Sequence, residues 1–376
     1  MRPAPYSVLV VDDSAMMRSL IGRIVESDPR TTLAGKAMDG RFALDKLDRL
    51  RPEVIVLDLA MPRMDGIEFL IERRKRRIDV PVIVLSAMAT SGASVTMEAL
   101  SLGASDFVLK PSGQGGPSLH EVAGHLLELI VSLGAEYRAR HGAPRTAAAP
   151  VSANPVSRAL GPRTATRQAV PTPAARRTIE PGPIELVAIG ISTGGPNALR
   201  KVLAMIPADL GCPVVIVQHM PPGFTPEFAR SLDLVSPLTV KEAEDGDRLE
   251  PGFAYVARGD YHMTVTSSPG GGRIHMNQDP PCNGHRPSAD VLLFSVAEQF
   301  GNRAIGVIMT GMGKDGAAAL GSVLRAGGIT IGQDQASSVI YGMPKAAYEM
   351  GHVEYEVSLS HMADTITGLV KGNPPA

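Results

Sequence analysis

The stretch 184–199, IELVAIGISTGGPNAL, joins an apolar run to a glycine-rich turn. The run IELVAIGIS is almost continuously apolar, which is typical of a strand in a parallel sheet whose two faces are both covered. The segment TGGPNAL predicts the start of a helix, because Pro196 suits the first helical turn. The stretch therefore predicts a parallel α/β fold in which Ser192 lies where a strand passes into a helix.

Two further apolar runs in this half of the chain end in side chains that could assist Ser192. PVVIVQHM, at 213–220, carries His219, and AIGVIMTGMGKDG, at 304–316, ends in a glycine turn with Asp315. The carboxyl ends of parallel strands meet at one edge of a sheet, so the three side chains are expected to lie close together. A nucleophilic serine needs a base, and the base needs an orienting acid. The pattern predicts a Ser–His–Asp hydrolase site.

Other interpretations of these residues stay open at this point. The turn at Ser192 spells G-x-S-x-G, but its backbone N–H groups would suit a phosphate as well as an oxyanion. The order Ser, His, Asp differs from the Ser, acid, His order of lipase-type hydrolases. Other histidines and aspartates could replace the favoured base and acid: His262, His275, His285, His352, His361, Asp290 and Asp334.

The first part of the chain alternates short apolar runs with amphipathic stretches, which predicts a second doubly wound parallel sheet. The five runs are SVLVVDD, TTLAGKA, EVIVLDL, VPVIVLS and SDFVLKP. Polar side chains stand at the ends of four of them: Asp12, Asp13, Asp58, Ser86 and Lys110. Carboxylates gathered at one edge repel each other unless a hard cation such as Mg²⁺ is present, and a lysine beside them suits a phosphoryl group.

Composition and length limit the possible classes of protein. A chain of 376 residues suits two domains, and no apolar run approaches the roughly 18 residues of a membrane span. Lys plus Arg is 37 and Asp plus Glu is 38, which does not favour nucleic acid as the main partner. Two cysteines without C-x-x-C spacing, and a start without a signal-peptide pattern, indicate a cytoplasmic protein.

A composition break divides the chain into two domains. Residues 136–183 are dominated by Ala, Pro, Thr and Arg without hydrophobic periodicity, which predicts a flexible linker. The predicted organisation is a domain at 4–135, this linker, and a second domain at 184–372 with a β-hairpin insertion.

The motifs VVDDSAMMR, VLDLAMPRMDG, VLSAMA and LKP resemble the receiver domain of two-component response regulators. The resemblance implies that Asp58 accepts phosphate and that Mg²⁺ is held by Asp12, Asp13 and Asp58. It also implies switch roles for Ser86, Phe107 and Lys110, and a cis peptide at Lys110–Pro111.

The motifs GISTGGPNAL, VQHMPPGFT, GFAYVARGDYHM, HRPSADVLLFSVA, TGMGKDGAAAL and GMPKAAYEMG resemble the catalytic domain of the chemotaxis protein-glutamate methylesterases, the CheB family. The resemblance implies a phosphorylation-regulated hydrolase that demethylates glutamate γ-methyl esters and deamidates glutamines on chemoreceptors. Ser192, His219 and Asp315 would be catalytic, with oxyanion donors at Thr193, Gly194 and Met312. The esterase reaction would need no cofactor.

The implied partners are methyl-accepting chemotaxis receptors as substrate and a chemotaxis histidine kinase as phosphodonor, with no nucleic acid and no insertion into the membrane. Two other classes of function are retained. One is a receiver joined to a DNA-binding output, which the parallel α/β pattern and the balanced charge disfavour. The other is a receiver-regulated docking module without esterase activity, in which GISTGG is only a turn.

Overall fold

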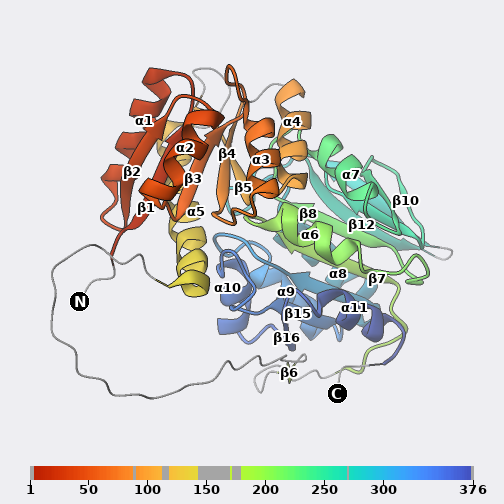
Figure 1. The fold of residues 1–376 in the computed structure, drawn as a ribbon. Helices are drawn as coiled ribbons and strands as arrows, with labels where there is room; N and C mark the ends of the chain where they lie inside the picture. Colours follow the sequence, from red (N-terminus) through yellow and green to blue (C-terminus); the bar gives the residue numbers. More distant parts are fainter. Residues whose placement is uncertain are drawn as a thin grey trace, which may run out of the picture.

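The computed structural model describes residues 4–87, 90–111, 118–142, 170–171, 179–268 and 271–373. Two α/β modules lie against each other, the first in red to yellow and the second in green to blue (Figure 1). The prediction of two parallel-sheet domains is confirmed. None of the helices in the described ranges combines the length and the apolar character that crossing a membrane requires.

The first module is a five-stranded parallel sheet in the order β2-β1-β3-β4-β5. Its strands are β1 (Tyr6–Val11), β2 (Thr31–Ala37), β3 (Val54–Asp58), β4 (Val82–Ser86) and β5 (Asp106–Leu109). Its helices are α1 (Ala15–Ser27), α2 (Gly40–Leu50), α3 (Gly66–Lys75), α4 (Thr90–Ser101) and α5 (Leu119–His141). The strand order reverses between β1 and β3, so their carboxyl ends form the crevice where ligands bind in such sheets.

Successive side chains of β1 point to opposite faces of the sheet, and both sets are apolar, which explains why helices cover both faces. Val8 and Val10 pack in one buried cluster with residues of α1 and α5. Leu9 and Val11 point the other way and pack with residues of α2, α3 and α4. Because both faces are apolar, the strand sequences read as continuous hydrophobic runs.

The second module contains an eight-stranded sheet in the order β6-β16-β15-β14-β7-β8-β11-β9, parallel except for β6 at one edge. Its strands are β6 (Val170–Pro171), β7 (Leu186–Ile191), β8 (Val214–Gln218), β9 (Thr239–Glu242), β11 (Phe253–Val256), β14 (Ala304–Ile308), β15 (Ile329–Gln333) and β16 (Tyr355–Val357). Its helices are α6 (Gly195–Leu203), α7 (Thr225–Asp233), α8 (Ala289–Phe300), α9 (Ala317–Arg325), α10 (Met343–Glu349) and α11 (Met362–Val370). The chain runs outward from β7 to β8 and later returns on the other side at β14, so the crevice lies between β7 and β14.

A small antiparallel sheet stands where the β-hairpin insertion was predicted. Strands β12 (His262–Ser268) and β13 (Gly271–Asn277) pair as a hairpin, and β10 (Arg248–Leu249) adds to it in the order β10-β13-β12. The sheet packs against α8 through β12. Two side chains of α8 accept from β12, Ser295 from the Val265 amide at 3.1 Å and Gln299 from the Ser267 amide at 3.4 Å, so the small sheet is fixed along this helix.

Helix α5 continues to His141 and so occupies the first residues of the predicted linker. The reason is tertiary: Arg138 donates to both carboxylate oxygens of Glu53 at 2.6 Å and lies over the ring of Tyr6. Most of the predicted linker, 143–169 and 172–178, lies outside the described residues. The expectation of a cis peptide at Lys110–Pro111 is wrong, because among the described residues the cis peptide bond lies at Arg286–Pro287. The isomer of an X–Pro bond is not fixed by the local sequence alone.

The two modules share an apolar interface. Phe107 of β5 stacks on Phe224, just before α7, with ring centroids 5.3 Å apart and an interplanar angle of 5°. Helix α4 of the first module packs against α6 and α7 of the second, and Figure 1 shows α4 beside these two helices. Polar contacts also join the two modules. The Asn197 side chain of α6 donates to the carbonyls of Ala104 and Ser105, at 2.7 and 2.9 Å. The first module thus lies over the carboxyl edge of the second.

Candidate active site and phosphoacceptor site

Ser192 lies in the turn between β7 and α6. Its carbonyl accepts hydrogen bonds from the Gly195 amide at 2.7 Å and from Gln218 Nε2 at 3.0 Å. Its own amide donates to the carbonyl of Thr310 at 3.0 Å, which ties the turn to the end of β14. Gly194 has a φ of +77°, a conformation that glycine adopts at little cost. The turn is therefore held from both sides at the crevice of the sheet.

His219 follows β8 and is hydrogen-bonded to Asp315. Its Nε2–H donates to Asp315 Oδ2 at 2.8 Å. Its Nδ1 is buried and has no hydrogen-bond partner among the described residues. Nδ1 is thus the nitrogen left to accept a proton, and it is not yet bonded to Ser192 Oγ. Catalytic hydrogen bonds often form only once substrate is bound.

Asp315 lies at the amino end of α8, where unpaired helical amides favour a negative charge. Its carboxylate accepts from the Ala289 amide at 2.6 Å and from Ser288 Oγ at 2.7 Å. The side chain of Asn283 adds a third donor at 3.0 Å. Burial opposes the charge, but the hydrogen bonds from His219, Asn283 and Ser288 hold the pKa of Asp315 well below its usual range. This carboxylate is ionised at neutral pH and can stabilise a charged imidazole.

Two further side chains neighbour this pair: His285, which the sequence offered only as an alternative base, and Asn283, for which the sequence predicted no role. The ring of His285 stacks on that of His219, with centroids 3.8 Å apart and an interplanar angle of 11°. The side chain of Asn283 donates to Asp315 at 3.0 Å and to Asp290 at 2.7 Å. The Asn-Gly pair at 283–284 is a strong signal for a hairpin turn. Nothing in the sequence, however, indicates which residues that turn contacts.

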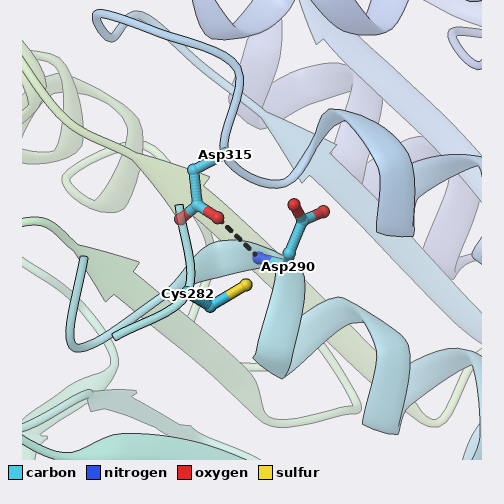
Figure 2. Close-up of side chains that lie close together, drawn as sticks. All are labelled: Cys282, Asp290 and Asp315. Carbon is cyan, nitrogen blue, oxygen red and sulfur yellow. Dashed lines mark hydrogen bonds between the residues drawn. The ribbon is translucent and has the colours of Figure 1, made fainter. Parts of the chain in front are cut away.

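Cys282, Asp290 and Asp315 form a cluster of possible metal-ligating atoms, all within 4.8 Å of one another (Figure 2). The Asp290 amide donates to Asp315, as the dashed line in Figure 2 marks. The Asp290 carboxylate accepts from the amide of Ala319 at 2.8 Å and from the side chain of Asn283. These carboxylates are hydrogen-bonded to donors, which favours a rigid support for the histidine over a metal centre.

The other candidate bases and acids have separate local roles. His262 donates to the carbonyl of Pro280, and His352 to that of Ala317. His275 contacts Thr266, and His361 contacts Ser358. Asp334 accepts from the Ser337 amide. The structure brings none of these five to His219 or Ser192 among the described residues.

The three predicted oxyanion donors lie in two loops of the same crevice, Thr193 and Gly194 after β7 and Met312 after β14. The Gly194 amide is occupied, since it donates at 2.7 Å to Asp106 Oδ2 of the first module. Burial raises the pKa of Asp106. A carboxylate oxygen of the first module thus lies where a negatively charged oxygen of a reaction intermediate could be stabilised.

The cleft in front of Ser192 and His219 has a volume of about 750 Å³ and is lined by both modules. The first module contributes Phe107 and His125 among others, and the second contributes His285 and Arg286. Access to the serine is therefore limited by the position of the first module.

The predicted acidic site lies at the carboxyl edge of the sheet in the first module. Asp12, Asp13 and Asp58 offer oxygens within 4.8 Å of one another. Lys110 Nζ lies 2.9 Å from Asp58 Oδ2 and 3.3 Å from Asp12 Oδ2. Burial raises the pKa of Asp12, with a smaller opposing effect of Lys110. Buried carboxylates that share one lysine provide the hard oxygen ligands that fit Mg²⁺.

Two of the three predicted switch residues, Ser86 and Phe107, contact elements of the module interface. Ser86 Oγ lies 2.6 Å from Thr96 Oγ1 on α4, the helix that packs against α6 and α7. Phe107 is 8% exposed and stacks on Phe224 of the second module. Ser86 thus contacts a helix that packs on the second module, and Phe107 contacts that module directly.

The fold and its side chains define a class: a receiver-type domain with an acidic site, joined to an α/β domain with a serine-hydrolase arrangement. Comparison with known families narrows this class. The family model for the response regulator receiver domain matches residues 8–116, and that for the CheB methylesterase matches residues 187–366.

Whole-chain relatives agree with both matches. The chain is 50% identical to a protein-glutamate methylesterase/protein-glutamine glutaminase of Treponema denticola, covering 96% of each chain. It is 46% identical to the protein of the same name from Treponema pallidum, again covering 96% of each. Among solved structures, the chain is similar to the Thermotoga maritima CheB methylesterase catalytic domain, with 40% identity, a TM-score of 0.49, and coverage of 50% of this chain and 98% of that one. The chain belongs to the CheB family of response-regulator methylesterases.

Proposed function

We propose that this protein hydrolyses glutamate γ-methyl esters, and deamidates glutamines, on methyl-accepting chemotaxis receptors in the cytoplasm. The observation that carries the proposal is the His219–Asp315 hydrogen bond beside the Ser192 turn, in a cleft lined by both modules. The names of the relatives support the substrate class. The domains are proposed to be a receiver at 4–135, a linker at 136–183 and an esterase at 184–372.

In the proposed mechanism Ser192 Oγ attacks the side-chain carbonyl carbon of the ester while His219 Nδ1 takes the hydroxyl proton. Asp315 holds the opposite nitrogen and stabilises the imidazolium. Amides at Thr193 and Met312, and at Gly194 once Asp106 has left, stabilise the oxyanion, at about 3 kcal/mol for each well-placed donor.

The leaving group departs with the proton that His219 carries, as methanol from an ester or as ammonia from a glutamine. A water molecule, deprotonated by His219, then attacks the acyl-enzyme carbonyl. Collapse of that intermediate releases glutamate and returns the proton to Ser192 Oγ. The reaction needs no group beyond these side chains and amides.

The receiver is proposed to accept a phosphoryl group at Asp58 from a chemotaxis histidine kinase. Asp12, Asp13 and Asp58 would hold a Mg²⁺ ion, which would offset the negative charge of the transferred group. Lys110 lies close enough to Asp58 to bind a phosphoryl oxygen, at 2.9 Å from the carboxylate. Ser86 and Phe107 would transmit the change to the interface.

The regulation is proposed to be autoinhibition. The receiver contributes residues to the rim of the cleft and its Asp106 occupies the Gly194 amide. Phosphorylation would favour a receiver conformation that fits this interface less well, and activation would be limited by that difference in affinity. A linker keeps the receiver at a high effective concentration near the cleft even when it is displaced.

Covalent labelling tests the catalytic proposal against the docking-module alternative. A small fluorophosphonate should modify Ser192 of the phosphorylated full chain and abolish methanol release from methylated receptor membranes. Ser192→Ala should take no label and release no methanol, with an unchanged thermal melting profile. Full methylesterase activity in Ser192→Ala would refute the mechanism, and an unlabelled, inactive wild-type chain would favour the docking module.

A further inference from the structure

The turn at 282–285 is built with little freedom. The Cys282 amide donates to the His285 carbonyl at 3.1 Å, and the His285 amide donates back to the Cys282 carbonyl at 2.9 Å. The two central residues, Asn283 and Gly284, have φ angles of +53° and +81°. Positive φ at both positions is the geometry of a type I′ turn, for which Asn-Gly is the preferred pair. The turn thus fixes the directions of the side chains beside it.

The segment after the turn is anchored independently. Arg286 donates to Asp260 Oδ1 through Nε at 3.0 Å and through Nη2 at 2.6 Å. Its Nη1 donates to the carbonyls of Gln278 and Asp279, at 2.9 and 3.0 Å. The backbone on both sides of His285 is therefore restrained, so its ring is held by the fold and not only by stacking.

From this turn two side chains reach the His219–Asp315 pair. Asn283 Nδ2 donates to Asp315 Oδ1 at 3.0 Å. The ring of His285 lies almost parallel to that of His219, with the centroids 3.8 Å apart. The turn therefore contacts both members of the pair at once.

The imidazole of His285 is uncharged near neutral pH. Burial, followed by the neighbouring His219, lowers the pKa of His285 to about 4. Near neutral pH the face of His219 is therefore covered by a neutral flat ring that does not repel an imidazolium. A ring in this position also restricts rotation of His219 about its own side-chain bonds.

We propose that His285 is a positioning residue for the hydrolytic reaction, whose ring holds the plane of His219 so that Nδ1 faces Ser192. The inference rests on the proposed Ser192 mechanism. A misplacement of a reacting group by about 1 Å can lower a rate about 10²-fold, which sets the scale of the expected effect.

The test compares His285→Ala with His285→Phe in the phosphorylated full chain. Phenylalanine keeps a flat ring that can stack, whereas alanine removes it. We expect His285→Ala to lose about 10²-fold in kcat for methanol release from methylated receptor membranes, with little change in KM. His285→Phe should recover most of this loss. The rate of Ser192 labelling by a small fluorophosphonate should follow kcat in both variants.

His275→Ala is the matched control, because His275 is an exposed histidine on β13 of the neighbouring sheet. It should behave as wild type. Two results would overturn the inference: a wild-type kcat in His285→Ala, or a raised KM with normal fluorophosphonate labelling, which would assign His285 to substrate contact. If Ser192→Ala keeps full activity, the proposed function itself fails, whatever the His285 variants do. Melting curves of both His285 variants separate unfolding from loss of positioning.

Discussion

At the scale of single residues, the proposed chemistry depends on a proton path from Ser192 to His219 that Asp315 stabilises. Such groups act as a unit in Ser–His–Asp hydrolases, so their losses do not add. We expect Ser192→Ala, His219→Ala and the double variant to lose similar activity, on the order of 10⁶-fold in kcat. Asp315→Asn should lose less, about 10⁴-fold, because the serine and the base remain. Single-turnover methanol release measures these losses.

Additive losses in the double variant would contradict a shared mechanism, since they would mean that Ser192 and His219 act in separate steps. A suitable reference is His361→Ala, because His361 contacts Ser358 outside the cleft. That variant should retain the wild-type rate.

At the scale of secondary-structure elements, the approach of β8 to the start of α6 depends on a missing side chain at Gly195. A Cβ atom built there would overlap the amide oxygen of Gln218, whose nitrogen donates to the Ser192 and His219 carbonyls. Gly195→Ala should therefore displace Gln218 or the Ser192 turn. We expect kcat to fall by about 10²-fold or more, measured as methanol release.

Gly124→Ala is the matched control for that substitution. Gly124 lies in α5 with no atom within 4 Å of a built Cβ. Alanine is favoured over glycine in a helix by about 1 kcal/mol, so this variant should melt at a slightly higher temperature with unchanged activity. Wild-type kcat in Gly195→Ala would show that the turn tolerates displacement of Gln218.

At the scale of the whole molecule, the receiver is proposed to control the esterase through a buried interface. Asp106→Ala removes the acceptor of the Gly194 amide bond, and an intramolecular hydrogen bond contributes about 0.5–1.5 kcal/mol. The unphosphorylated full chain should therefore become several-fold, up to about tenfold, more active in methanol release. Asp58→Ala should take up no acid-labile phosphoryl group and keep the low basal rate.

Asp45→Ala controls for a general effect of removing a receiver carboxylate, because Asp45 is exposed on α2. It should leave the basal rate unchanged. If Asp106→Ala stays at the wild-type basal rate while phosphorylation still activates the chain, the phosphorylated receiver assists the esterase directly. The proposed autoinhibition is then wrong.

The two parallel α/β domains and the polar groups at their strand ends could be predicted from the amino-acid sequence alone. Continuous apolar runs encode strands that are buried on both faces, and parallel topology brings their carboxyl ends to one edge. The sequence therefore predicts that Asp12, Asp58 and Lys110 lie close together. It predicts the same of His219 and Asp315. These inferences need only local patterns and one general rule of sheet architecture.

The contacts that support those groups are visible in the folded chain and could not be predicted from the sequence. Three contacts join segments that are far apart in the chain. They are the stacking of His285 on His219, the hydrogen bond from His219 Nε2 to Asp315, and the hydrogen bond from the Gly194 amide to Asp106. Hydrophobic periodicity records which face of an element is buried, but not which loop or which module covers it. The path of a loop across a sheet edge and the docking of one module on another result from packing of the whole chain, so they cannot be inferred from any one stretch of it.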